Sequence, residues 1–208
     1  MDNKTFHVVK LTLTGVGNSC NPTSDIAILA TFTDYNAAKM RAKEILLNEG
    51  YDESLFKVLD VNGGKHRGKN SNDLVIYAEG LLDEKYTVEI ETISTNAKVE
   101  GDDDGRVRCP LYYVLQTVVR NTKDGTGCEV DSTIKSMHWT RKLARAAITS
   151  ALFDDKTSKD GFVEYAEHAD GMNGPEGPDC MGPWGPDVII RAVKENGETN
   201  FVSIKRCN

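Results

Sequence analysis

The sequence of 208 residues lacks most of the patterns that assign a protein to a class. It holds no run of about 18 apolar residues, so it predicts no transmembrane helix. Its five cysteines are odd in number, scattered and without a CxxC pair. Such cysteines are typical of a reduced compartment, so we expect a cytoplasmic protein; a secreted protein that has lost its leader is the alternative.

Positive charge is also scarce, with 25 Lys and Arg against 32 Asp and Glu and a net charge of −7. Nucleic acids and anionic membrane surfaces attract a concentrated positive face, so this balance counts against both as partners. The apolar share of 39% is ordinary for a globular chain. We therefore expect a soluble protein that binds neither nucleic acid nor membrane.

Motifs for catalysis and for cofactor binding are missing as well. The chain has no G-x-S-x-G, H-E-x-x-H or Rossmann glycine pattern. His138 precedes a predicted helix, but no carboxylate or nucleophile can be identified that would make it a general base. The sequence thus predicts no catalytic residue, no cofactor and no metal ion.

What the chain does contain is an internal likeness. The segment DLVIYAEG at residues 73–80 and the segment DVIIRAVK at residues 187–194 both read Asp, a run of large apolar residues and a polar turn. An offset of 106 superimposes five identical residues: Asp25, Ile28, Ala38, Leu46 and Phe56 on Asp131, Ile134, Ala144, Leu152 and Phe162. An offset of 114 superimposes five more: Ile76, Ala78, Glu84, Val88 and Ile90 on Ile190, Ala192, Glu198, Val202 and Ile204. The offset changes only in a loop, where insertions are tolerated.

These offsets predict an α+β fold made by tandem internal duplication, with the order ββαβββ occurring twice. The first repeat would span residues 1–98 and the second residues 107–208, with residues 99–106 as an acidic linker. Antiparallel sheets, each with one packed helix, would form an intramolecular pseudo-dimer, because a repeat of about 100 residues has only a marginal core. The alternative is a chance likeness between two unrelated α+β segments.

The helices and one strand give the sharpest local predictions. Asp34 and Thr140 are N-cap residues, and they predict a first helix that ends at Gly50 and a second helix over residues 140–153. In the strand Tyr86–Thr92, acidic residues alternate with Val and Ile. This alternation predicts a sheet with one solvated face that carries Glu89 and Glu91.

The loop before the fourth strand of the first repeat is basic. It carries Lys65, His66, Arg67 and Lys69 in the stretch GGKHRGKN. We expect these residues to be candidate contacts for an anion or an acidic partner segment. The alternative is an exposed loop whose charges only keep it soluble.

The equivalent loop of the second repeat is long and rich in Gly and Pro. It gathers His168, Cys180, Met181 and Trp184, which we take as candidate partner or ligand contacts because aromatic residues concentrate at binding hot spots. One alternative makes His168, Asp170 and Cys180 ligands of a metal, although their spacing matches no known pattern. Another alternative folds Trp184 back as an apolar plug.

The function expected from these features is non-catalytic protein binding. The groove between the repeats or the long loops would contact a protein partner. The alternative is a small-molecule-binding protein or enzyme with a site at the pseudo-twofold axis, where His138, Tyr165 and His168 would be the first candidates. Self-association through exposed sheet faces, giving a homodimer, is a third possibility.

Overall fold

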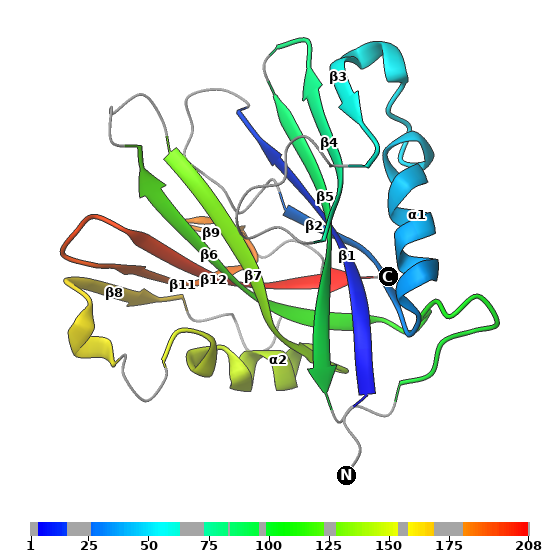
Figure 1. Cartoon of the computed structure of the whole chain (residues 1–208). Coiled ribbons are helices and arrows are strands. Elements are labelled where there is room, and N and C mark those ends of the chain that lie inside the picture. The colour runs from blue at the N-terminus through cyan, green and yellow to red at the C-terminus, as the bar shows by residue number, and fades with distance from the viewer. Residues whose placement is uncertain are drawn as a thin grey trace. The chain divides into compact units, whose positions relative to one another are not determined.

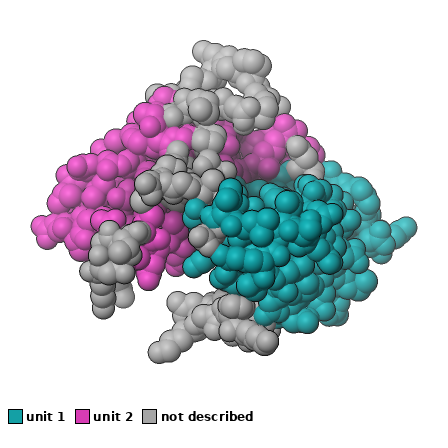
Figure 2. Space-filling view, turned by 90° about the horizontal axis from the view of Figure 1, so that it is seen from above, with its two compact units in different colours: residues 1–19, 25–109, 207–208 teal, residues 20–24, 110–206 magenta. Residues whose placement is uncertain are grey.

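The computed structural model describes residues 4–15, 26–62, 73–82, 84–95, 99–122, 128–153, 158–168 and 181–207. The chain divides into two compact units, coloured separately in Figure 2. Unit 1 comprises residues 1–19, 25–109 and 207–208, and unit 2 comprises residues 20–24 and 110–206. Each unit contains a five-stranded antiparallel sheet with one α-helix, so the predicted α+β fold is confirmed (Figure 1).

The sheet of unit 1 has the order β2-β1-β5-β4-β3. Its elements are β1 (Lys4–Thr14), β2 (Ile26–Phe32), α1 (Tyr35–Asn48), the 3-10 helix η1 (Glu53–Leu55), β3 (Phe56–Asp60), β4 (Leu74–Gly80) and β5 (Lys85–Thr95). The first and last strands of the unit are therefore neighbours at the centre of the sheet.

The sheet of unit 2 has the order β7-β6-β12-β11-β8, which is the same topology. Its elements are β6 (Leu111–Asn121), β7 (Cys128–His138), α2 (Arg141–Ala147), η2 (Thr149–Ala151), η3 (Lys159–Gly161), β8 (Glu164–Glu167), β11 (Val188–Val193) and β12 (Thr199–Cys207), whose last residue is grouped with unit 1. Two short strands, β9 (Met181–Gly182) and β10 (Gly185–Pro186), pair with each other before β11.

The two sheets also share two register shifts. The register between the first two strands of each unit shifts between Val9 and Lys10 and between Val114 and Leu115. The register between the last two strands shifts between Leu74 and Ile76 and between Val188 and Ile190. A β-bulge inserts an extra residue at one place in a ladder, so matching bulges are a stringent sign of common origin. The arrangement is that of a tandem duplicate, and it extends the likeness to β1 and β6 with an offset of 105.

Residues related by the offsets of 105 (β1), 106 (β2 to β3) and 114 (β4 and β5) are called counterparts below. Asp73 and Asp187 are counterparts, and each precedes a buried strand. Their carbonyl oxygens accept hydrogen bonds from the N–H groups of Ile90 (3.0 Å) and Ile204 (3.1 Å). The first residue of each helix contacts the side chain of this aspartate in its own unit. Tyr35 Oη donates to Asp73 Oδ1 at 3.2 Å, and Arg141 Nη1 lies 3.7 Å from Asp187 Oδ1. Both aspartates thus contact the first residue of the helix in their own unit, one through a hydrogen bond and the other through an ion pair.

Each helix begins at the predicted cap and packs on one face of its sheet. Asp34 accepts a hydrogen bond from the N–H of Ala37 at 2.8 Å, and Thr140 accepts one from Leu143 at 3.2 Å. The buried residues of α1 are Ala38, Ala42, Ile45 and Leu46. The second helix is shorter than predicted, because the α-helix ends at Ala147 and continues as the 3-10 helix η2. Ser150 Oγ donates to the carbonyl of Ala147 at 2.6 Å, a side-chain bond that competes with regular helix.

The segment predicted as an acidic linker between the repeats lies within unit 1. The N–H of Thr33 donates to Gly105 O and the N–H of Val107 donates to Thr31 O, both at 2.8 Å, so this segment runs along the edge strand β2. Val99 and Val107 are buried. These two buried valines hold residues 99–109 against the rest of unit 1, although most of the residues between them are charged or glycine.

The sheet face of unit 1 opposite α1 is not solvated at its centre, so that prediction was wrong. Lys10 is 2% exposed, and its ammonium group contacts the carboxylates of Glu89, at 3.3 Å, and of Glu91. Phe6 and Val8 on the same face are fully buried. The two glutamates alternate with Val and Ile because they surround a buried cation.

No helix in the described part of the chain is long and apolar enough to cross a membrane.

The Lys10 cluster yields a stability prediction. Lys10→Leu removes the cation that contacts Glu89 and Glu91, so we expect the free energy of unfolding to fall by about 2–4 kcal/mol. The triple variant K10L/E89S/E91K carries the unit 2 counterparts Leu115, Ser203 and Lys205. It should regain most of the loss in urea-induced unfolding. A single variant as stable as the original protein would contradict this role for the cluster.

Candidate functional site

The described residues include only some of the candidate residues named from the sequence. Lys65, His66, Arg67, Lys69 and Cys180 lie outside the described residues. Met181 begins β9. The N–H of His168 donates to Ile189 O at 2.7 Å, and its carbonyl lies 3.4 Å from Arg145 Nη2. Both contacts are made by the backbone of His168. The hydrogen bond to Ile189 continues the pairing of β8 with β11.

Trp184 lies against an apolar cluster of unit 2. It is half-buried and packs with Val119, Val188 and Phe201, on the sheet face opposite α2. These residues come from β6, β11 and β12, so the tryptophan is held by the sheet itself. The packing matches the alternative in which the ring serves as an apolar plug, and any partner would contact only its remaining exposed edge.

The histidine that had been a possible catalytic base is held by a neighbouring hydroxyl group. His138 ends β7, and its Nε2 lies 2.8 Å from Ser136 Oγ. Burial lowers the pKa of the imidazole, which favours its neutral form. Within the described residues, no group of three His, Cys, Asp or Glu side chains could hold a metal ion. Asp170 and Cys180, the other residues of the metal alternative, lie outside that part of the chain.

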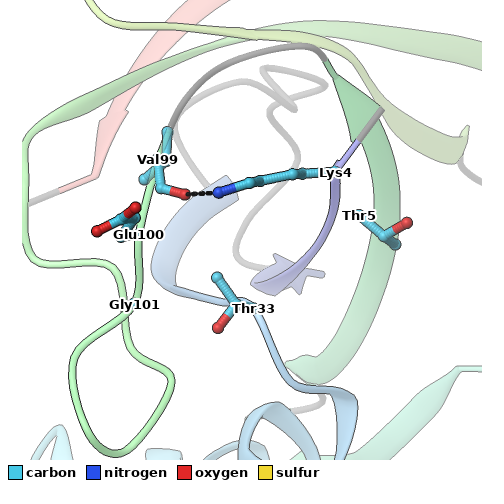
Figure 3. A pocket seen from close by; sticks show the side chains of 6 residues that line it. All are labelled: Lys4, Thr5, Thr33, Val99, Glu100 and Gly101. Atoms are coloured by element: carbon cyan, nitrogen blue, oxygen red, sulfur yellow. Dashed lines mark hydrogen bonds between the residues drawn. The ribbon is translucent and has the colours of Figure 1, made fainter. Parts of the chain in front are cut away.

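One hollow of unit 1 is open, and few side chains line it. Its volume is about 450 Å³, and it lies between the start of β1 and residues 99–101 (Figure 3). Lys4 Nζ donates to Val99 O at 3.4 Å, and Thr33 Oγ1 donates to Gly105 O at 3.2 Å. These side chains are exposed and already serve the backbone, so the hollow offers few free groups to a ligand.

A stronger candidate is the end of unit 1 where β3 begins and β4 ends. Phe56 pairs with Gly80 across these antiparallel strands, so the next positions outward, Leu55 and Leu81, face each other at the end of the ladder. Leu55, Leu81 and Leu82 are exposed by 47%, 63% and 82%. We call these three residues the leucine end.

The leucine end lies next to a cluster of packed aromatic rings. Beneath it the rings of Tyr51, Phe56 and Tyr86 pack together, with Tyr86 at 5.3 Å from each of the other two centroids. The turn itself is closed by the Gly80 N–H, which donates to Glu84 O at 2.8 Å. The Glu84 carboxylate accepts the N–H of Leu82 at 2.9 Å. Both hydrogen bonds close the connection that carries Leu81 and Leu82.

Unit 2 builds the same end from different residues. The counterparts of Leu55, Leu81 and Leu82 are Gly161, Glu195 and Asn196, all exposed. The turn is closed by the same bond, from Lys194 N–H to Glu198 O at 2.9 Å. The framework therefore forms without the leucines, and their exposure is not a requirement of the fold.

Sequence reasoning missed the leucine end. A signal was present, since two consecutive leucines occupy a turn between two strands, where Gly, Asn, Asp and Ser are usual. The placement of Leu55 beside them depends on the pairing of β3 with β4 and could not be read from spacing.

The chain matches no protein-family model, and comparison with curated proteins and with solved structures gives no match.

The placement of Trp184 generates a prediction. Trp184→Ala removes a half-buried ring from the cluster of Val119, Val188 and Phe201, so we expect a loss of about 1–3 kcal/mol, below the cost of deleting a fully buried aromatic. Thermal unfolding measures this loss. Trp139→Ala, which removes a ring that is 40% exposed at the start of α2, is the matched control and should cost less. Equal melting temperatures for W184A and the original protein would mean that the cluster does not depend on the ring.

Proposed function

We propose that this protein binds a protein partner through the leucine end of unit 1. The observation that carries the proposal is the exposure of Leu55, Leu81 and Leu82 at positions where unit 2 has Gly161, Glu195 and Asn196. Exposed leucines forgo the free energy of apolar burial, about 1.5–3 kcal/mol for each side chain when it is fully buried. Contiguous apolar residues left at a surface mark interaction sites when the fold does not need them.

The charges beside the leucines define the partner. The two segments that carry them, residues 49–56 and 80–85, hold five acidic residues and one lysine. Asp52 caps η1, and hydrogen bonds from Ser54 lower the pKa of its carboxyl group, which stays ionised at neutral pH. A surface with apolar residues at its centre and acidic residues around them complements a peptide whose apolar side chains are flanked by Lys or Arg.

The hydrogen bonds that close the turn favour binding. An ordered surface loses little conformational freedom when a partner docks, so more of the interaction free energy appears as affinity. The hydrogen bonds of Glu84 and Gly80 hold the leucines in place before any partner arrives. We place this interaction in the cytoplasm, because the five cysteines are odd in number, scattered and without a CxxC pair.

The test is a peptide selection followed by a matched pair of variants. Peptides selected on the full chain should carry apolar residues flanked by Lys or Arg. The variant L81E/L82N installs the unit 2 counterparts and should weaken the selected peptides by about 10-fold to 100-fold, since each buried leucine is worth on the order of 1.4 kcal/mol or more. Fluorescence anisotropy measures the affinity.

The control variant is Met40→Ala. Met40 is 69% exposed on α1, outside the leucine end, and its counterpart in unit 2 is Ala146. The change removes an exposed apolar side chain of similar size and should leave peptide affinity unchanged. Selected peptides that lack basic residues, or that bind L81E/L82N as well as the original protein, would refute the proposal. Loss of self-association in L81E/L82N, seen by light scattering, would instead identify a second copy of the chain as the occupant.

A further inference from the structure

A small hollow in unit 2 lies among residues that have apolar counterparts in unit 1. Its volume is about 150 Å³, and the residues that line it include Gln116, Lys135, Phe153, Phe162, Lys194 and Asn200. They come from β6, β7, β12 and the segments that follow η2, η3 and β11. An apolar cavity of that volume accommodates a molecule the size of benzene.

In unit 1 the same place is filled. The counterparts of Gln116, Lys135 and Asn200 are Leu11, Leu29 and Tyr86, and all three pack in the core cluster under α1. Leu29 and Lys135 are both the extra residue of the matching bulge. One copy thus closes this space with apolar side chains, whereas the other keeps a hollow and lines it with polar groups.

The polar groups are held in fixed orientations. Asn200 is 2% exposed, its Oδ1 accepts from Gln116 Nε2 at 2.9 Å, and its Nδ2 donates to Glu198 Oε1 at 3.4 Å. Glu198 also accepts from Arg120 Nε at 2.8 Å and from Lys194 Nζ at 2.6 Å. Burial by itself raises the pKa of the Glu198 carboxyl group, but the hydrogen bonds from Lys194 and Arg120 outweigh it and lower the pKa. Buried polar groups reduce stability unless they are fully paired, and this network is paired and therefore ordered.

One cation remains available at the hollow. Lys194 is neutralised by Glu198, but Lys135 has no ion pair or hydrogen bond through its side chain within the described residues. Gln116 Nε2 has a second N–H beside the one that it gives to Asn200. The walls on the other side are the rings of Phe153 and Phe162, whose centroids lie 6.4 Å apart.

We propose that this hollow binds a small monocarboxylate, with Lys135 pairing with the carboxylate and the two phenylalanines contacting the apolar part of the ligand. A ligand of roughly the size of butyrate or benzoate fits this volume. The hollow lies in unit 2 and the leucine end lies in unit 1, so a negative result for one site does not contradict the proposal for the other.

The test compares carboxylates with their neutral amides. Butyrate and benzoate are titrated into the full chain by NMR or calorimetry, with butyramide and benzamide as matched probes. We expect saturable binding of the acids, with dissociation constants on the order of 1 mM for ligands of this size, and at least 10-fold weaker binding of the amides.

A pair of lysine variants locates the site. Lys135→Leu installs the counterpart Leu29 and should weaken carboxylate binding at least 10-fold. Lys142→Leu changes another exposed lysine of unit 2, on α2, and should leave binding unchanged. Circular dichroism verifies that both fold. L81E/L82N should retain carboxylate binding, which separates this result from a failure of the protein-binding proposal. Absence of saturable binding, equal binding of the amides, or equal effects of the two lysine variants would overturn the inference.

Discussion

The pairing of the first strand of each unit with the last is the constraint on which the rest of the structure depends. In unit 1, β1 and β5 form an unbroken antiparallel ladder from Lys4 opposite Thr95 to Thr14 opposite Lys85. This register decides which residues meet the helix. Val9, Leu11, Val88 and Ile90 join the core under α1, and Lys10, Glu89 and Glu91 meet on the other face. In unit 2, β6 and β12 occupy the same central places, so every other strand and the helix take up the same positions.

A framework that occurs twice allows the two copies to differ where the ladders do not need particular side chains. Two of the bulges, the positions of the helix caps and the closing bond of the last hairpin are the same in both units. The ends of the strands differ, with exposed leucines in one unit and a polar network around Asn200 in the other. Each copy thus serves as an internal standard for the other. A residue that differs between them at an equivalent position is one that the fold permits but does not dictate.

The sequence was informative about the framework because the duplication keeps its spacing. The helix caps and the order of elements along the chain follow from local residue types, and Asp34 and Thr140 lie where expected. The burial of Lys10 was not predictable, since an alternating strand reads the same whether its polar face meets water or a buried cation. The burial of Val99 and Val107 could not be read from residues 99–107, because the run of acidic residues between them is typical of an exposed segment. The leucine end and the hollow depend on which strands are neighbours, which no local pattern specifies.

The central position of the first and last strands has a consequence for how the chain is made. Residues about 80 apart in sequence must meet before either sheet has a middle, and such distant pairing is slow because closing the loop is entropically costly. On the ribosome, α1 and the β3–β4 hairpin of unit 1 would wait with their apolar faces uncovered until β5 emerged. Unit 2 repeats this delay. Each unit therefore completes its central ladder only after its last strand has been synthesised.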